Sequence, residues 1–280
     1  ISSITASRIL SENRADLEKA MERLASGKRI NSAADDAAGM AVAAKMRADI
    51  GSLNQSVRNT NDAISLVNTY DGAAAEIESI LIRMRELAVQ TRNGTYEEAD
   101  RTNANFEYTA LKNEITRIAG VSAFNRMTVG QGSSGAAGGT GVADTTFTFY
   151  VGSDVAKTGN SIAFAAKALD LNLAVSSGTL NSVVDTASAG QAIATLDDAI
   201  TELAANRAQA GALINRLEHT VSNLMNVSQR LQEAVSGIED ADYAAESANL
   251  ARGMVLAQAG TAMLAQANQA PQYILSLLRG

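Results

Sequence analysis

Apolar residues recur at every third or fourth position over several long stretches of this chain. In the longest such seam twelve of fourteen positions are apolar, and its members are Ile193, Leu196, Ile200, Leu203, Arg207, Ala210, Ile214, Leu217, Val221, Leu224, Ser228, Leu231, Val235 and Ile238. A repeat near 3.5 residues is typical of a helix that packs along another helix. At about 1.5 Å per residue, the seam predicts a helix of roughly 70 Å and therefore a rod rather than a globule.

Two further seams lie in the first half of the chain. One occupies residues 46–67 and, after a slip of one residue near Gly72, residues 70–91. An Asn-Gly turn signal at residues 93–94 separates it from a shorter seam at residues 104–118. The slip either sets a bend or a register or is a simple imperfection of the repeat. With the longest seam, these patterns predict three helices that can run antiparallel.

The first residues predict a separate helix. Its apolar face holds Leu10, Leu17, Met21 and Leu24. Polar residues and a glycine interrupt it at positions 26–31. The residues that follow, Ser32 to Asp35, fit a capping box, in which a hydroxyl and a carboxylate satisfy free amide groups at a new helix start. The adjacent Asp35 and Asp36 point to different faces of a helix, so we assign them to capping rather than to acid–base catalysis.

The last stretch of the chain is apolar and uncharged. No charged side chain occurs from Gly253 to Leu278. Amides such as Gln258 and Gln266, together with Pro271, argue against a membrane span, because a hydrocarbon layer offers them no hydrogen-bond partners. Other protein surfaces must therefore bury this segment, and further copies of the same chain are the simplest source. A helix of this kind is expected to be poorly ordered until such partners arrive.

The middle of the chain has a different pattern. Residues 130–141 are rich in Gly, Ser and Ala and predict a loop. Apolar and polar residues alternate in Thr145–Val151, Ser161–Ala165 and Leu171–Val175, which predicts three short strands. The predicted fold is mainly α, a long antiparallel helical coiled-coil rod formed by both ends of the chain, with a small β-hairpin-rich central region.

Three domains follow from these patterns. Residues 1–36 and 240–280 are predicted to form terminal helices. Residues 37–123 and 188–239 are predicted to form the helical rod, and residues 124–187 a short exposed β and loop region. Because both ends of the chain contribute to the first two domains, the termini should meet at the end of the rod that lies opposite the β region.

Composition narrows the possible functions. The net charge is −7 and the isoelectric point is near 4.9, without a basic cluster, which argues against nucleic acid as a partner. The sequence contains no Cys and a single His, His219, which is expected to be a solvated residue of a helix face. No spacing of residues fits a catalytic triad, a zinc site or a phosphate loop. We therefore expect a protein that is not an enzyme and has no cofactor or metal.

Two polar features remain. The acidic residues Glu239, Asp240 and Asp242 lack the spacing of a calcium loop and are assigned to charge at a helix start. Arg207 interrupts the longest seam, and its guanidinium needs a carboxylate partner or must reach water. Either it sets the register of the helices, or its stem packs while its head is solvated.

Motifs at both ends resemble one family. The segment Arg23–Gly39 resembles the amino-terminal signature of bacterial flagellin. Several later segments resemble the carboxy-terminal signature of the same family: Asn215–Glu218, Ile238–Asp242 and Gln258–Asn268, followed by Pro271-Gln272 and Leu275–Leu278. The motifs occur in the family's order and at opposite ends. The chain is similar to a short flagellin without large outer domains.

The resemblance implies a structural filament subunit that self-assembles for swimming motility as a homopolymer of many copies. It implies type III export to an extracellular flagellum, which suits a chain start without the pattern of an ordinary signal peptide. An export chaperone, the filament cap and hook–filament junction proteins are implied partners. The residues expected to mediate subunit assembly are Leu10, Leu17, Met21, Leu24, Leu250, Met254, Leu256, Met263, Leu264, Ile274, Leu275 and Leu278.

Other readings stay open at this point. Arg83, Leu87 and Glu107 match positions at which a vertebrate Toll-like receptor recognises flagellin, although the same helix is explained by core packing. A hook–filament junction protein shares the terminal helices. The β region could instead bind glycans or host tissue, because Phe147, Phe149 and Tyr150 leave room for a stacking platform.

Overall fold

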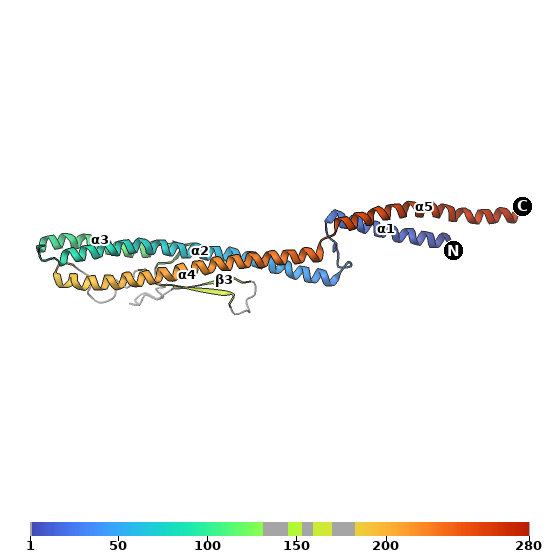
Figure 1. Ribbon diagram of the computed structural model, residues 1–280. Helices are drawn as coiled ribbons and strands as arrows, with labels where there is room; N and C mark the ends of the chain where they lie inside the picture. Colours follow the sequence, from blue (N-terminus) through green and yellow to red (C-terminus); the bar gives the residue numbers. More distant parts are fainter. Residues whose placement is uncertain (1, 131–144, 153–158, 170–182, 280) are drawn as a thin grey trace. The chain divides into compact units, whose positions relative to one another are not determined.

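The computed structural model describes residues 2–130, 145–152, 159–169 and 183–279. Within these residues the chain is mainly α-helical (Figure 1), which confirms the predicted fold class. The elements in chain order are α1 (Ser2–Ser26), α2 (Ala37–Arg92), α3 (Glu98–Val121), β1 (Ala123–Phe124), β2 (Met127–Thr128), β3 (Thr145–Tyr150), β4 (Ser161–Ala166), α4 (Thr186–Glu239) and α5 (Tyr243–Arg279).

The chain divides into two compact units. The first, which we call the terminal unit, comprises residues 1–51 and 228–280, and the second, the central unit, comprises residues 52–227. The long helices α2 and α4 each contribute to both units. The domain boundaries predicted from the sequence lie at helix ends and remain predictions.

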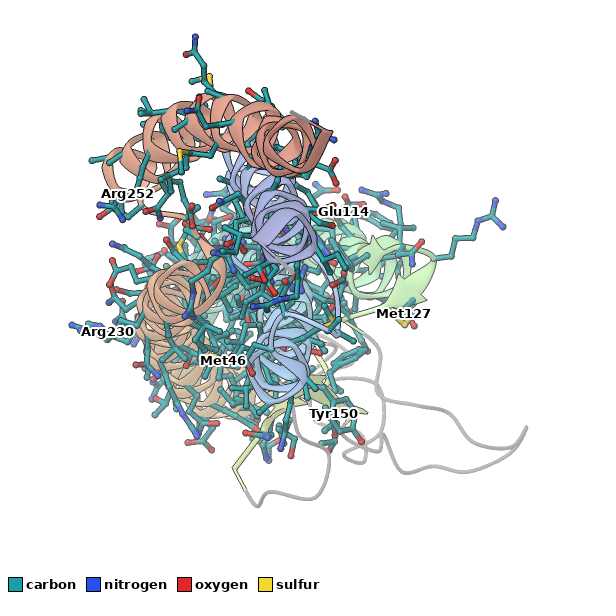
Figure 2. All side chains as sticks on the ribbon, turned by 90° about the vertical axis from the view of Figure 1, so that its right-hand side faces the viewer. Met46, Glu114, Met127, Tyr150, Arg230 and Arg252 are labelled. Atoms are coloured by element: carbon teal, nitrogen blue, oxygen red, sulfur yellow. The ribbon has the colours of Figure 1, made fainter. Side chains whose placement is uncertain are left out.

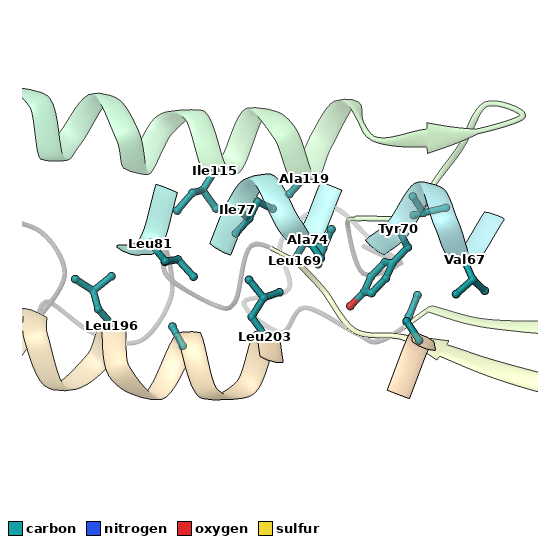
Figure 3. Close-up of a cluster of buried hydrophobic side chains, with 14 of the residues drawn as sticks. Val67, Tyr70, Ala74, Ile77, Leu81, Ile115, Ala119, Leu169, Leu196 and Leu203 are labelled. Carbon is teal, nitrogen blue, oxygen red and sulfur yellow. The ribbon is translucent and has the colours of Figure 1, made fainter. Parts of the chain in front are cut away.

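The core of the central unit is built from the predicted seams. On α2 all seven seam positions from Tyr70 to Thr91 are buried, and on α4 Leu196, Leu203, Ala210 and Leu217 are buried. In Figure 3 Leu81 of α2 and Leu196 and Leu203 of α4 point toward each other, beside Ile115 of α3. Each fully buried aliphatic side chain contributes roughly 1.5–3 kcal/mol relative to an exposed one, so this core stabilises the unit within a single chain.

A tight turn follows α3. The strands β1 and β2 pair antiparallel, with Phe124 opposite Met127, and the two turn residues Asn125 and Arg126 have φ values of 48° and 65°. Positive φ at both central residues is the geometry of a type I′ turn, whose twist suits a hairpin. Gly130 then passes so close to α3 that an added Cβ would lie 2.7 Å from the Ala119 carbonyl oxygen.

The larger hairpin covers part of the helical core. Strands β3 and β4 pair antiparallel, and alternate residues of β4, including Phe164, are buried. The ring of Phe164 meets Tyr70 edge-on at 5.3 Å between centroids, an arrangement that aromatic pairs prefer. Two of the three predicted strands are thus confirmed. The predicted strand at 171–175 and most of the predicted loop at 130–141 lie outside the described residues.

The capping prediction was wrong about which residue starts α2. The Ser32 and Asn31 amides do donate to the Asp35 carboxylate, at 3.0 and 3.2 Å, but they close a turn. The cap is Asp36, whose carboxylate accepts a bond from the Gly39 amide at 2.8 Å, and α2 begins at Ala37. A carboxylate that binds the amide three residues later is the usual N-cap arrangement.

Candidate assembly surface on the terminal helices

Helices α1 and α5 lie side by side and antiparallel, and we call them the terminal helix pair (Figure 1). A Cβ added at Gly253 would lie 3.2 Å from Leu17, and one added at Gly260 would lie 3.1 Å from Leu10. Each leucine therefore sits over a glycine of the other helix. The two leucines are seven residues apart on α1, and the two glycines are seven residues apart on α5, so both contacts lie on one seam. Because glycine has no side chain, the helices can approach closely there.

The outer surface of α5 is apolar in several directions. Three consecutive residues, Met254, Val255 and Leu256, are 53%, 66% and 43% exposed. Consecutive residues of an α-helix point about 100° apart, so these three cover more than half of its circumference. A helix that is apolar on most sides is normally buried on most sides. The contact with α1 accounts for only one of those sides.

A shallow apolar groove runs beside the Leu10–Gly260 contact. It has a volume of about 510 Å³ and is lined by Ile9 of α1 and by Leu256, Ala259 and Met263 of α5, with Thr5 and Asn13 at its rim. Exposed grooves lined by apolar residues on both walls are typical of protein interaction sites.

Charged residues fix one end of the terminal helix pair. Arg23 of α1 donates to the carboxylate of Glu246 of α5 at 2.8 Å, and Glu246 is buried. Next to this contact Lys19 and Asp35 form an ion pair at 2.7 Å. The hydrogen bond from Lys19 holds the pKa of Asp35 well below its ordinary value, and the Ser32 amide adds to this shift.

A second set of bonds ties the two connecting segments of the terminal unit. Glu239 is buried and pairs with Arg47 at 2.5 Å and with Lys28 at 3.6 Å. The Ala241 amide donates to the carbonyl of Gly27, whose φ of 70° ends α1. Asp242 caps α5 by accepting from the Ala244 amide at 2.9 Å. Charge at a helix start, as predicted, thus explains Asp242, whereas Glu239 is a buried ion-pair partner.

The predicted assembly residues fall into two groups. Leu10 is buried and Leu17, Leu24, Leu250 and Leu264 are half-buried, whereas Met21, Met254, Leu256 and Met263 are exposed. The side chains of Ile274, Leu275 and Leu278 lie outside the described residues. Three further apolar residues of these helices are exposed but were not predicted from the sequence, namely Ile4, Ile9 and Val255. These three residues lie outside the seam along which α1 and α5 meet. The absence of charged residues around Val255 is the sequence signal from which its exposure on an assembly surface could have been predicted.

The residues named for receptor recognition lie in the central unit. Arg83 donates to Glu107 of α3 at 2.8 Å and to Glu86 at 3.1 Å, and these acceptors raise its pKa. Leu87 is buried, so only the two charged residues are accessible. They line a polar hollow of about 390 Å³ together with Tyr96.

Beside Arg207 in the α4 seam, the buried polar residue is its neighbour Asn206. The Arg207 side chain is about one third exposed; it donates to Asp71 of α2 at 2.9 Å and also to Glu78. Asn206 is buried, and its amide nitrogen has no hydrogen-bond partner among the described residues. Arg207 thus packs its stem and pairs its partly exposed head with two carboxylates of α2, and its register-setting role stays a prediction.

The part of the chain that the structure describes contains no metal site and no helix that could span a membrane. His219 is exposed on α4, as predicted. Within the described ranges no group of three or more His, Asp or Glu side chains could hold a metal ion. Among the helices of those same ranges, none has the length and hydropathy that crossing a membrane requires.

Comparisons with known proteins agree at both ends of the chain. The model of the bacterial flagellin N-terminal helical region matches residues 1–134, and that of the C-terminal helical region matches residues 193–278. A flagellin of Halalkalibacterium halodurans is 43% identical over 94% of this chain and 92% of its own length. The flagellar filament 33 kDa core protein of Treponema phagedenis is 38% identical over 100% and 98%.

A flagellin of Bacillus subtilis is 38% identical over 96% of this chain and 95% of its own length. The crystal structure of a Bacillus cereus flagellin is 34% identical, covers 60% of this chain and 88% of its own, and has a TM-score of 0.49. The matches to the family models and to relatives over nearly the full length show that this chain belongs to the bacterial flagellin family.

Proposed function

We propose that this protein is a structural subunit of the bacterial flagellar filament and that it self-assembles through its terminal helices for swimming motility. The observation that carries the proposal is the exposure of Met254, Val255 and Leu256 in three directions around α5. Family membership supports it, because two relatives are named flagellin and a third a filament core protein.

The physical reason is the cost of leaving this surface in water. Burial of apolar surface contributes about 25 cal/mol per Å², and within the subunit only one side of α5 is covered by α1. Several neighbouring copies are needed to cover the other sides. Helical packing around a filament axis provides such neighbours, and it lets each copy both bury its own α5 and cover that of another.

The experiment compares charge placed on α5 with the same charge placed elsewhere. Val255→Glu should abolish filaments seen by electron microscopy and sedimentation, since it would bury a carboxylate without a partner. Met225→Glu changes a similarly exposed apolar residue of α4 in the central unit and should leave assembly close to wild type. Filaments of normal length and yield from Val255→Glu would contradict the proposal.

The same proposal extends to location and partners. We propose type III export, an extracellular filament, and contacts with an export chaperone, the filament cap and the hook–filament junction. Deletion of the gene should leave hooks without filaments in electron micrographs. Secreted, unpolymerised flagellin in the deletion strain would instead point to a junction protein, which the names of the relatives do not favour.

Recognition by a vertebrate Toll-like receptor is proposed for the Arg83–Glu107 surface. Both side chains are half-exposed and joined by an ion pair. A receptor can therefore contact the two charged groups together as a single polar surface. Arg83→Ala should lower receptor signalling in a reporter-cell assay, and Arg117→Ala, which removes a comparable exposed ion pair with Glu114 on α3, should not. Equal signalling by both variants and by wild type would contradict this part.

A further inference from the structure

Three methionines of the terminal helix pair, Met21, Met254 and Met263, are exposed. The sequence contains eight methionines. Met84 of the central core is fully buried, whereas Met254 and Met263 of α5 are 53% and 65% exposed. The thioether is the one readily oxidised side chain of a protein without cysteine, and exposure governs how fast it reacts.

These two methionines lie where assembly is proposed to bury apolar surface. Met263 lines the groove with Ile9 and Leu256, and Met254 begins the run of exposed apolar residues on α5. From Gly253 to Leu278 α5 carries no charged side chain, and the last charge before this run, Arg252, points outward from the helix (Figure 2). A strongly polar oxygen placed here would therefore have few donors when neighbouring copies close over it.

We propose that Met254 and Met263 form an oxidation-sensitive site that controls assembly: a peroxide oxidises them in the free subunit and blocks polymerisation, while polymerisation protects them. This inference rests on the proposed function. In the reaction the peroxide O–O bond breaks and an S–O bond forms. The sulfur loses two electrons, and hydrogen peroxide supplies the oxygen and leaves as water, so each thioether becomes a sulfoxide.

The effect follows from the polarity of the sulfoxide. An oxygen acceptor buried without a partner is unfavourable, so one sulfoxide per subunit should raise the critical concentration for assembly about tenfold, which corresponds to about 1.4 kcal/mol. The change is chemically reversible, because methionine sulfoxide reductases A and B reduce the two sulfoxide epimers. Oxidative damage to side chains other than methionine would not be repaired by these enzymes.

The experiment oxidises the full chain with hydrogen peroxide as monomer and as filament, maps sulfoxides by peptide mass spectrometry, and measures critical concentration by sedimentation. Oxidised monomer should assemble about tenfold less well and recover after treatment with both reductases. Met254→Leu with Met263→Leu keeps the apolar volume, so this variant should assemble normally and lose most of its sensitivity to peroxide, with Met21 as the remaining exposed methionine of the terminal helix pair. Met127→Leu with Met225→Leu alters two exposed methionines of the central unit, one at the small hairpin (Figure 2), and should stay sensitive.

The outcomes separate the two proposals. If untreated wild-type protein does not polymerise, the proposed function fails, and this inference fails with it. If untreated protein polymerises and oxidised protein polymerises equally well, only this inference is overturned. Should the Met254→Leu, Met263→Leu variant itself assemble poorly, the mapping still decides: equal oxidation rates of these two residues in monomer and filament would overturn the inference.

Discussion

The two units of this chain bury their apolar residues by different means. In the central unit the seam residues of α2 and α4, such as Leu81 and Leu203, are fully buried by other elements of the same chain. In the terminal unit Leu10 is buried between α1 and α5, but Met254, Val255 and Leu256 remain exposed. The central unit therefore has a complete hydrophobic core of its own. In the terminal helix pair apolar residues are buried only where α1 and α5 meet. The same kind of helix can therefore serve folding or assembly, according to how many of its sides the chain covers.

The largest expected effect separates folding from assembly. Leu81→Ala should lower the free energy of unfolding by about 2–5 kcal/mol, since it leaves a cavity in a well-packed core. Leu256→Ala should change the free energy of unfolding of the monomer by less than about 0.5 kcal/mol, because its side chain is exposed, yet it should weaken assembly. Chemical denaturation and sedimentation measure the two effects. Equal destabilisation of the monomer by both substitutions would break the distinction between the units.

A second prediction concerns the contact inside the terminal helix pair. Gly260→Ala places a methyl group against Leu10 and should weaken the α1–α5 contact by about 1–3 kcal/mol, measured as loss of helicity in the terminal segments. Gly211→Ala is the matched control, because an added Cβ at this position of α4 meets nothing within 4 Å. There the gain in helix propensity should stabilise the protein by up to about 1 kcal/mol. Stabilisation by Gly260→Ala would show that the close approach is unimportant.

A third prediction tests the polar contact between α2 and α4. Arg207→Ala removes the partner of both Asp71 and Glu78 and should cost about 1 kcal/mol, since the ion pairs are partly exposed and screened. Arg230→Ala, at an exposed position of α4 where the side chain points outward (Figure 2), should cost almost nothing. Thermal unfolding at low and high salt compares them. A loss from Arg207→Ala no larger than from Arg230→Ala would mean that the pair is not stabilising.

The smallest expected effect is a dependence on pH in the terminal unit. Lys19 lowers the pKa of Asp35 in the folded state, so the unfolded state binds a proton more readily. The contribution is complete above the ordinary Asp pKa of about 3.9 and is lost as the pH falls through the lower folded value. Asp35→Asn should flatten the acid limb of the stability curve, followed by circular dichroism. An unchanged acid limb would show that the Lys19 contact is not formed in solution.

Much of the fold could be predicted from hydrophobic periodicity. From Tyr70 to Thr91 the predicted seam and the buried face of α2 coincide, because a long helix buried along one side repeats the same spacing many times. Periodicity failed where one residue decided the outcome. It could not distinguish Asn206 from Arg207 beside the seam, nor Asp35 from Asp36 as the cap of α2. The first choice depends on contacts between residues far apart in the sequence, and the second on which carboxylate meets the Gly39 amide and which meets Lys19.

The candidate site was predicted only in part. The uncharged run after Gly253 predicts that α5 is a surface for other copies, but the role of glycine in the α1–α5 contact was not predicted. The seven-residue spacing shared by Leu10 and Leu17 with Gly253 and Gly260 is a signal in the sequence, which gains meaning once the two helices are known to be antiparallel. The exposure of Val255 could not be predicted without knowing which side of α5 meets α1.

Hydrogen exchange, followed by mass spectrometry in dilute monomer and in polymer, tests the central claim most directly. Amide protection reports how often each helix opens. We predict that the amides of residues 196–217 of α4 are protected from exchange in both states. Those of residues 243–266 of α5 should exchange rapidly in the monomer and slowly in the polymer. Equal and strong protection of α5 in monomer and polymer would contradict the claim that other copies of the chain complete its burial.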